Sequence, residues 1–524
     1  MNDDHRSSHE WRARMYKSNA RDQNEMRRKR REDEVQIRKI HREEQFERNR
    51  RATVQRSLSN EEVSELMKTV LDGLHSFQEE HNYQALRKFN NDLDKKLWAI
   101  ETIAKAQILN KLADVYCNRT IGDTTRQLVS QTLLKISVLD SRNFEKSSFD
   151  NICIQSLVSN ISAFSTNEDV LCDTFQALAC FLIRSITYRN LALDNAIVPE
   201  LIEVSTKTMS VRLQRTLMWL VSLFCEKLDK YSPHVDEVTP LLEIIATGIT
   251  SSDPMVQTDA ASSCAFLADW PPIYEHMSEH KLCSMLVANL SNDKGNARPK
   301  VKCGISYIIQ ATSYFTEEMI DAGLLEVLKG FVNVSYMSQE VCFIISNICV
   351  EGEHTIDKLI SSGVLREVAR VMEAAEYRSR KEAAFVICHC CSSSNRRHLE
   401  YVIELGMLVS FTDLLTCMDV SLVAYILDAI HSLLQFGDLH LNSDNSNPVA
   451  VKLEEAGCRQ KLEFLSESQC FDIHIKAYTI LERFYEDEDV MTAEQEITNY
   501  QPHSTIDNTI DMVIRNNSSA PYSF

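Results

Sequence analysis

A repeat of 40 to 43 residues constrains the fold of this chain more than any other feature of its sequence. Corresponding positions in successive apolar segments recur at that interval, at Ala179, Trp219, Ser262, Cys303, Phe343, Phe385 and Asp428. A period of this length is typical of helical units that bury their apolar faces only by stacking against their neighbours. The sequence therefore predicts an array of stacked helices rather than a set of separate globular cores.

A second series of residues, in the turns between helices, keeps the same period. Glycine stands in these turns at Gly323, Gly363, Gly406 and Gly457, and Asn195 takes the corresponding place three repeats before Gly323. Because glycine, and after it asparagine, adopts the left-handed backbone conformation most readily, we expect that conformation at each position. We therefore predict an all-α fold, a right-handed α-solenoid of about ten armadillo repeats in which one helix per unit lines a continuous groove.

Charge is divided unevenly along the chain. Residues 1–56 hold 17 Lys+Arg and 11 Asp+Glu, a net charge of +6, whereas residues 57–524 hold 39 basic and 64 acidic side chains, a net charge of −25. A basic arm tethered to an acidic body either docks onto that body or is presented to a separate acidic partner. We predict four parts: a disordered or helical basic arm (1–56), a linker (57–75), the armadillo array (76–490) and a disordered tail (491–524).

The sequence carries no signature of an enzyme, a metal site or a cofactor site. It has no glycine-rich phosphate loop, no nucleophile elbow and no His/Glu set at metal spacing. Most of its sixteen cysteines are interpreted as small apolar core residues. The cluster Cys388-His389-Cys390-Cys391 is interpreted as part of a helix, because adjacent side chains on a helix diverge by about 100° and cannot converge on one ion. No apolar stretch reaches the roughly 18 residues of a membrane span, so membrane insertion is not expected.

The arm and the later repeats carry the motifs of one family. The arm contains three basic clusters in order, Arg27-Arg28-Lys29-Arg30-Arg31, Arg38-Lys39 and Arg48-Asn49-Arg50-Arg51. The seventh to ninth repeats contain Gln339-Glu340-Val341-Cys342-Phe343, Lys381-Glu382-Ala383-Ala384-Phe385 and Ile426-Leu427-Asp428-Ala429-Ile430. The order of arm, linker, ten armadillo units and acidic tail resembles importin alpha, and the arm is similar to its importin-beta-binding domain.

The resemblance implies a nuclear import adaptor that shuttles between cytoplasm and nucleus. Its groove would bind the basic nuclear-localisation signals of cargo proteins, and its arm would lie in the groove when importin beta is absent. The acidic residues Glu486, Asp487, Glu488 and Asp489 lie near the end where this family meets its export receptor. The arm residues that would bind importin beta are Arg27, Arg28, Lys29, Arg30, Arg31, Arg38, Lys39, Arg48, Arg50 and Arg51.

The groove of importin alpha uses a Trp on the groove helix of most units and an Asn four residues later, on the same face of the helix. The indole rings hold basic side chains of the signal by cation–π contacts, and the Asn amides hold its backbone. In this chain the six pairs read Ala179/Ile183, Trp219/Leu223, Ser262/Phe266, Cys303/Tyr307, Phe343/Asn347 and Phe385/His389. We therefore expect weakened signal binding in an altered form, at Trp219, Phe343, Asn347, Phe385 and His389.

Several alternatives stay open on the sequence alone. Phe343 and Phe385 could pack between helices instead of lining the groove. Thr187 and Arg397 stand where the family has carboxylates near its signal sites, which further weakens the match. The altered pairs also fit an armadillo scaffold that binds extended peptides outside nuclear transport. Nucleic-acid binding through the arm is disfavoured, because the net charge of the body would repel phosphate.

Overall fold

The structure, a computed structural model, describes most of the chain between residues 60 and 485. The described ranges are 60–74, 78–94, 103, 108–118, 120–138, 151–159, 161, 167–231, 233–292, 298–392, 395–443 and 446–485. The predicted basic arm, the predicted tail and the acidic residues from Glu486 lie outside them. The chain divides into two compact units, Met1–Val371 and Met372–Phe524, which are described separately below.

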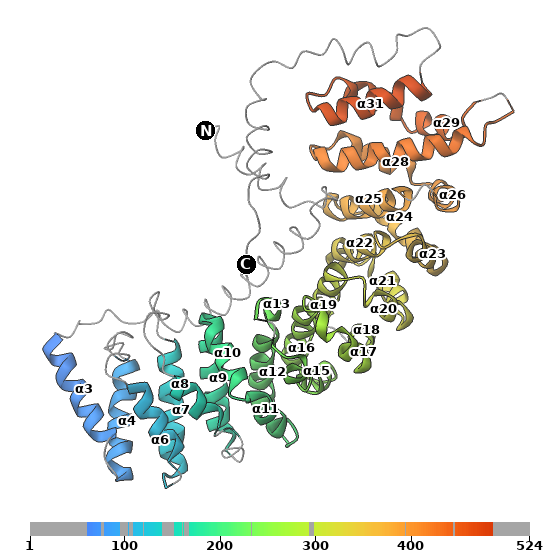
Figure 1. The fold of residues 1–524 in the computed structure, drawn as a ribbon. Helices are drawn as coiled ribbons and strands as arrows, with labels where there is room; N and C mark the ends of the chain where they lie inside the picture. Colours follow the sequence, from blue (N-terminus) through green and yellow to red (C-terminus); the bar gives the residue numbers. More distant parts are fainter. Residues whose placement is uncertain are drawn as a thin grey trace. The chain divides into compact units, whose positions relative to one another are not determined.

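The first unit is a succession of helices, and strands are absent from the described residues (Figure 1). Its helices up to residue 249 are α3 (Asn60–Leu74), α4 (Glu79–Asp94), α6 (Ile108–Cys117), α7 (Asp123–Val138), α8 (Asn151–Val158), α9 (Glu168–Arg184), α10 (Ile186–Asp194), α11 (Ile197–Ser205), α12 (Val211–Cys225), α13 (Leu228–Tyr231), α14 (Val235–Val238) and α15 (Leu241–Ile249). The remainder are α16 (Pro254–Leu267), η3 (Pro271–Ile273), α17 (Tyr274–Glu279), α18 (Leu282–Asn292), α19 (Arg298–Ala311), α20 (Thr316–Asp321), α21 (Leu324–Phe331), α22 (Ser335–Cys349) and α23 (Glu353–Ser362), and the boundary between the units falls within α24 (Val364–Ala374).

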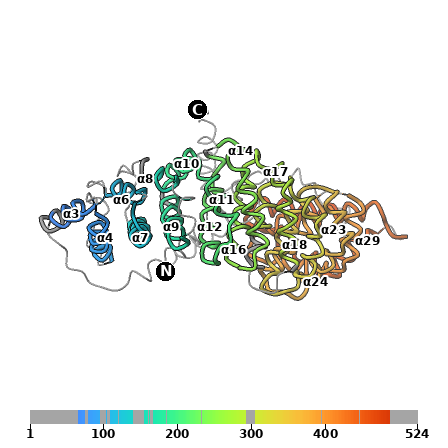
Figure 2. Tube along the Cα trace, turned by 90° about the horizontal axis from the view of Figure 1, so that it is seen from below, coloured from blue at the N-terminus to red at the C-terminus, as the bar shows by residue number. Residues whose placement is uncertain are grey.

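Two layers of helices make up the first unit. The long helices α4, α7, α9, α12, α16, α19 and α22 each contact the next in the series, and Figures 1 and 2 show α9 and α12 side by side. The shorter helices form the second layer, in which α11 contacts α15, α15 contacts α18 and α18 contacts α20 and α21. Each long helix thus packs against equivalent helices of its neighbours, which is how a repeat buries its apolar stripe.

The second unit repeats the same arrangement on a smaller scale. Its helices are α25 (Tyr377–Ser392), α26 (Arg396–Glu404), α27 (Leu408–Asp413), η4 (Leu414–Thr416), α28 (Val420–Asp438), α29 (Pro448–Glu455), α30 (Cys458–Ser466) and α31 (Phe471–Phe484). The long helices α25, α28 and α31 pack in sequence, and α27, α29 and α30 pack beside them. By length and composition α28 alone among the described residues could span a membrane, although the sequence led us to expect no apolar stretch of that length, and half of this stretch is buried inside the structure.

The predicted period is confirmed by the helices. The seven repeat positions lie one on each of seven successive long helices, α9, α12, α16, α19, α22, α25 and α28. Polar caps start several of these helices: Ser210 before α12, Asp253 before α16 and Asp419 before α28 each accept a hydrogen bond from a backbone N–H of the first turn. The fold class is therefore an all-α array of armadillo type, as predicted.

The turn series is confirmed at the glycines but not at Asn195. Gly323, Gly363, Gly406 and Gly457 have φ angles of +95°, +73°, +73° and +71°. Asn195 instead has φ −92°, and its side-chain amide donates to the Leu191 carbonyl at 2.7 Å. The left-handed residue is its neighbour Ala196, with φ +57°, which directly precedes α11 just as Gly323 directly precedes α21. Asn195 is thus held by its own side chain as the end of α10, and the turn falls one residue later.

Helix α3 occupies most of the segment that the sequence assigned to a linker. Its residues Met67, Val70 and Leu74 are buried, and the helix contacts α4 and α6. The described part of the predicted linker is therefore a helix that packs against the array, and the domain bounds remain a prediction.

Most of the described cysteines belong to the apolar core, as predicted. Among the described residues, Cys180, Cys264, Cys342 and Cys349 are buried free thiols, as are Cys388, Cys390 and Cys391 on α25. Burial raises the pKa of Cys225 to about 12, which keeps this thiol protonated at neutral pH.

Candidate functional site

The candidate signal-binding face lies on the long helices, and Trp219 on α12 is its best-placed residue. Trp219 is half-buried, and Leu223, one turn later, is also half-buried. Residues four apart on a helix lie on the same face, so indole and leucine together form one apolar surface. The amide that the family would place at the second position is replaced here by an aliphatic side chain.

Two arginines occupy the same side of α12 as Trp219. Arg212 donates to Asp169 of α9 at 2.8 Å and to Asp173 of α9 at 3.3 Å. Arg215 donates to both carboxylate oxygens of Asp253, at 3.0 and 2.5 Å. These pairs tie α12 to α9 and to the start of α16, and they set three carboxylates opposite two guanidiniums on the N-terminal turns of the helix that carries Trp219.

The pKa values of Asp253 and Asp173 are shifted in opposite directions by their surroundings. The Arg215 guanidinium, together with backbone N–H groups of α16, holds the pKa of Asp253 below its usual range. Burial raises the pKa of Asp173 to about 6, although Arg212 opposes the rise. Asp253 is therefore a stable anion at neutral pH, whereas Asp173 is ionised at a cost that its contact with Arg212 only partly offsets.

The second members of the Trp/Asn pairs form an accessible row. Ile183, Leu223, Phe266 and Tyr307 are all half-buried in the first unit. Among the first members, Ala179 is fully buried and Ser262 is 5% exposed and donates its hydroxyl to the Thr258 carbonyl, whereas Trp219 is half-buried. The surface that this row offers is therefore largely apolar and aromatic where the family has amides.

Phe343 and Asn347 follow the same pattern on α22. Phe343 is 6% exposed, so it packs in the core, which is the alternative left open by the sequence. Asn347 is half-buried, and its amide donates to the Phe343 carbonyl at 2.9 Å within the helix. This bond uses one of the two N–H donors of the amide, so the other N–H and the amide oxygen can still bind a peptide backbone.

In the second unit, Phe385 is a core residue. It is 1% exposed and packs edge-to-face on Tyr425 of α28, with ring centroids 5.7 Å apart. His389, one turn later, is half-buried, and its ring lies 6.1 Å from that of Tyr425. The accessible aromatic surface here is formed by His389 and Tyr425, and Tyr425 was not anticipated from the sequence.

A buried ion pair also joins α25 to α28. Lys381 is 3% exposed and pairs with Asp419, the N-cap of α28. Burial lowers the pKa of Lys381, and Asp419 opposes that effect. The sequence motif beginning at Lys381 therefore serves the packing of two long helices.

Thr187 and Arg397 are both exposed, at the N-termini of α10 and α26. Neither supplies the negative charge that the family has at the corresponding positions. The basic residues predicted to bind importin beta lie outside the described residues.

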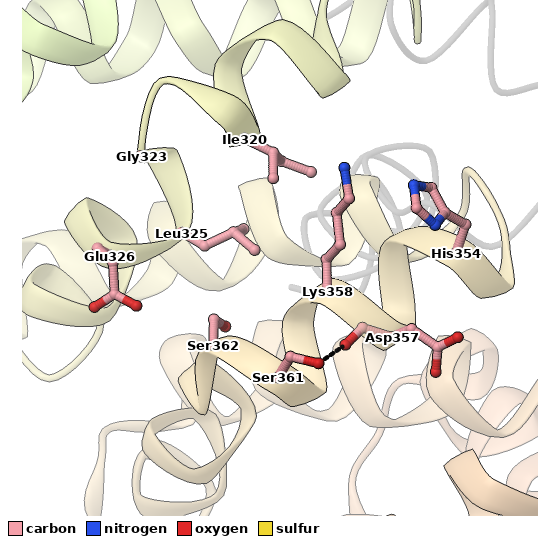
Figure 3. Close-up of a pocket in the computed structure, with 9 residues that line it drawn as sticks. All are labelled: Ile320, Gly323, Leu325, Glu326, His354, Asp357, Lys358, Ser361 and Ser362. Carbon is pink, nitrogen blue, oxygen red and sulfur yellow. Dashed lines mark hydrogen bonds between the residues drawn. The ribbon is translucent and has the colours of Figure 1, made fainter.

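An open pocket of about 390 Å³ lies elsewhere, between α20, α21 and α23 (Figure 3). Ile320 and Leu325 contribute its apolar lining, and Lys358 projects beside them (Figure 3). Lys358 pairs with Glu317 and lies 3.8 Å from Asp321. The pocket belongs to the shorter helices, so it is not part of the face that carries Trp219.

Comparison with known proteins identifies the family. The chain is 70% identical over 525 residues to Importin subunit alpha-1 of Caenorhabditis elegans, and the match covers all of both chains. The chain belongs to the importin alpha family. More distant relatives of this importin alpha include Importin subunit alpha-8 of Arabidopsis thaliana, 21% identical over 76% of this chain and 93% of that one.

Two family models match parts of this importin alpha chain. The importin beta binding domain matches residues 12–100, a range that contains all three basic clusters of the arm, and an atypical Arm repeat matches residues 447–499. Among solved structures, an engineered protein matches 80% of this chain and 98% of its own with a TM-score of 0.64 and 18% identity, which shows the fold alone.

Proposed function

We propose that this chain is a nuclear import adaptor that binds basic nuclear-localisation signals at the α12 face around Trp219 and importin beta through its N-terminal arm. The observation that carries the proposal is the full-length identity to an importin alpha together with the importin beta binding domain over residues 12–100. In this proposal the chain shuttles between cytoplasm and nucleus, and the acidic residues from Glu486 help to bind an export receptor.

The arm supplies the contact with importin beta. Its three clusters contain Arg27, Arg28, Lys29, Arg30, Arg31, Arg38, Lys39, Arg48, Arg50 and Arg51. Guanidinium groups form two parallel hydrogen bonds to a carboxylate, so clusters of arginine suit an acidic protein surface. The same positive charge attracts the arm to the acidic body, and importin beta competes with that attraction.

The α12 face supports signal binding by its chemistry. A half-buried indole attracts a Lys or Arg side chain with about 0.5–2 kcal/mol by a cation–π contact. Three carboxylates opposite two guanidiniums leave a net negative charge on the N-terminal turns of the same helix, which favours a basic peptide. Asn347 and His389 are half-buried polar residues that offer further hydrogen bonds at other points of the array.

The accessible row of Ile183, Leu223, Phe266 and Tyr307 changes the kind of signal that fits. Ile183, Leu223 and Phe266 do not clamp a peptide backbone as amides do, because aliphatic and phenyl groups neither donate nor accept a hydrogen bond, whereas Tyr307 keeps a hydroxyl that does both. They do contact the aliphatic stems of lysine and arginine and any apolar residue of the signal. The chain therefore prefers signals that mix basic and apolar residues to uninterrupted runs of lysine.

A titration tests the proposal directly. Fluorescein-labelled basic signal peptides, with and without interspersed leucines, are added to the full chain in the presence of saturating importin beta. The wild type should bind, the mixed peptide should bind more tightly, and Trp219→Ala should weaken binding about two- to thirtyfold. Importin beta alone serves as the blank.

Two results would argue against the proposal. A full chain that does not bind importin beta, in a pull-down at physiological salt, would remove its transport role and favour a peptide-binding scaffold. Equal peptide affinity for the wild type and Trp219→Ala would place the signal elsewhere.

A further inference from the structure

The long helix α31 is the last of its series among the described residues. Within the second unit each earlier long helix is covered on one side by the next, since α25 contacts α28 and α28 contacts α31 (Figure 1). The described part of the chain has no helix after α31. One side of α31 therefore stands where a further repeat would pack, and the terminal repeat of such an array needs a cover on that side.

Contacts with α28 show which side of α31 faces the array. Lys476 pairs with Asp428 of α28, and the ring of Phe484 lies 5.8 Å from that of His431 of α28. Lys476 and Phe484 are eight residues apart, so they project within about 80° of each other. Their mean direction defines the inner side of α31.

Three apolar residues point to the opposite side. At about 100° per residue, Phe471 and Tyr478 project within about 20° of the direction opposite to the inner side, and Ile475 within about 40°. Phe471 is 54% exposed, and Ile475 and Tyr478 are half-buried. These three residues, the α31 outer face, form an apolar stripe at the spacing i, i+4 and i+7.

The same position is buried in the preceding repeat. The turn glycines Gly406 and Gly457 align the last two repeats, and this alignment sets Leu427 of α28 against Tyr478 of α31. Leu427 lies one turn before His431, on the side of α28 that meets α31, and it is fully buried. The side of α28 that carries the next helix is thus closed, whereas the matching side of α31 is partly open.

A segment of the sequence beyond α31 has the pattern of a cover for this face. Residues 506–514, which lie outside the described residues, carry apolar side chains at Ile506, Ile510, Val513 and Ile514. Their spacing, i, i+4, i+7 and i+8, is that of one face of a helix. A segment that is disordered by itself can become ordered when it binds an apolar surface.

The length of chain before this segment lets it reach the α31 outer face. Residues 486–505 separate it from Tyr485, the last described residue. These residues span up to about 66 Å when extended, whereas α31, with its 14 residues, is about 21 Å long. Tethering gives the segment an effective concentration on the order of 1 mM. Even a site of moderate affinity would therefore be occupied.

We propose that the α31 outer face is a docking site for residues 506–514 of the same chain, which pack along it as a helix and close the end of the array. Contact between Phe471, Tyr478 and the apolar stripe of the segment removes apolar surface from water on both sides. This inference goes beyond the proposed function and depends neither on signal binding nor on importin beta.

Competition with a separate peptide tests the docking. A fluorescein-labelled peptide of residues 503–518 is titrated into the full chain, and fluorescence anisotropy reports binding. The tethered segment blocks the face in the wild type, whereas Ile510→Asp should release it, so this variant should bind the peptide about tenfold more tightly. Asn508→Asp is the matched control, because it adds the same charge on the opposite side of the segment. It should bind the peptide as the wild type does.

A second set of variants tests the face itself. Added to the Ile510→Asp chain, Phe471→Ser should reduce peptide affinity about five- to fiftyfold, because it removes the most exposed ring of the α31 outer face. Tyr478→Ser should reduce the affinity in the same way. Val409→Ser should not, since Val409 of α27, in the preceding repeat, is 58% exposed without belonging to this face. Thermal melts of each variant report whether the fold is intact.

Three results would overturn the inference. The first is equal peptide affinity in the wild type, Ile510→Asp and Asn508→Asp. The second is undiminished peptide affinity in both folded variants of the face, Phe471→Ser and Tyr478→Ser. The third is a dimer of the wild type, seen by sedimentation, that Phe471→Ser dissociates and Ile510→Asp leaves intact, because the occupant would then be a second copy of the chain.

Discussion

Arg215 of α12 and Asp253 at the start of α16 form a two-pronged ion pair, with nitrogen–oxygen distances of 3.0 and 2.5 Å. Asp253 also caps α16 by accepting from the backbone N–H groups of Met255 and Val256. The second unit repeats this relationship with Lys381 and Asp419, where Asp419 caps α28. In both cases the cation precedes the repeat position of its helix by four residues, and the carboxylate precedes the next repeat position by nine. One contact thus starts a long helix and fixes its register on the preceding one.

Replacing Asp253 should destabilise the first unit. Asp253→Ala removes the cap and the ion pair, and we expect the free energy of unfolding to fall by about 1–2 kcal/mol. Asp253→Asn keeps the cap but loses the charge, so its effect should be smaller. Urea denaturation followed by circular dichroism measures both, and equal losses in the two variants would show that the cap contributes nothing.

The stability of the first unit should depend on pH through Asp173. Burial raises the pKa of Asp173 in the folded chain to about 6, whereas an aspartate in an unfolded chain titrates near 3.9, as a rough reference value. Between these values the folded chain holds a proton that the unfolded chain has lost, so this contribution to stability falls as pH rises and is fully lost above the folded pKa. As the pH rises from about 4 to about 6, the melting temperature of Asp173→Asn should therefore increase relative to that of the wild type. A parallel pH dependence in both chains would contradict the assignment.

An amide four residues after Trp219 should strengthen binding of simple basic signals. Leu223→Asn supplies a donor and an acceptor for the peptide backbone, and one such hydrogen bond should tighten binding about two- to tenfold. Leu223→Ala is the control, since it removes the leucine without adding an amide. Peptide titration of the full chain with importin beta measures both, and a gain in the control equal to that of Leu223→Asn would mean that the leucine merely obstructs the peptide.

Phe385 should contribute to the stability of the second unit rather than to a peptide-binding surface. Its ring is 1% exposed, so Phe385→Ala should lower the free energy of unfolding by about 3–5 kcal/mol. Phe464 of α30, in the same unit, is 74% exposed, and Phe464→Ala should change stability by less than about 0.5 kcal/mol. Denaturation curves that shift equally for the two variants would be inconsistent with the buried position of Phe385.

Glycine at residue 196 should stabilise the chain. Ala196 has φ +57°, a conformation that costs a residue with a Cβ atom about 1–2 kcal/mol. Ala196→Gly relieves that strain, although it also frees the unfolded chain, so we expect a net gain of about 0.5–1 kcal/mol. Gly323→Ala is the reverse experiment. Gly323 has φ +95° and open space where a Cβ atom would stand, so the variant should lose stability through backbone strain alone. A loss in Ala196→Gly would show that residue 196 is not strained.

The sequence predicted how residues are arranged within one helix, but it left open what neighbouring helices cover. The pairing of Trp219 with Leu223 follows from helical geometry within α12 and was predicted. The burial of Phe343 and Phe385 depends on neighbouring helices, and the sequence left it open. The ion pair of Arg212 with Asp173 joins residues 39 apart, and no spacing rule within one helix could reveal it.

By itself the sequence determined the period, the helical class, the position of each long helix and the basic arm, because these follow from local backbone preferences and from the spacing of apolar residues. Only the tertiary structure decided which residues of the long helices are covered, which carboxylates Arg212 and Arg215 hold, and that Ala196 rather than Asn195 makes the left-handed turn. Helical periodicity fixes the direction of a side chain, but its burial and its partner depend on the register of the next helix.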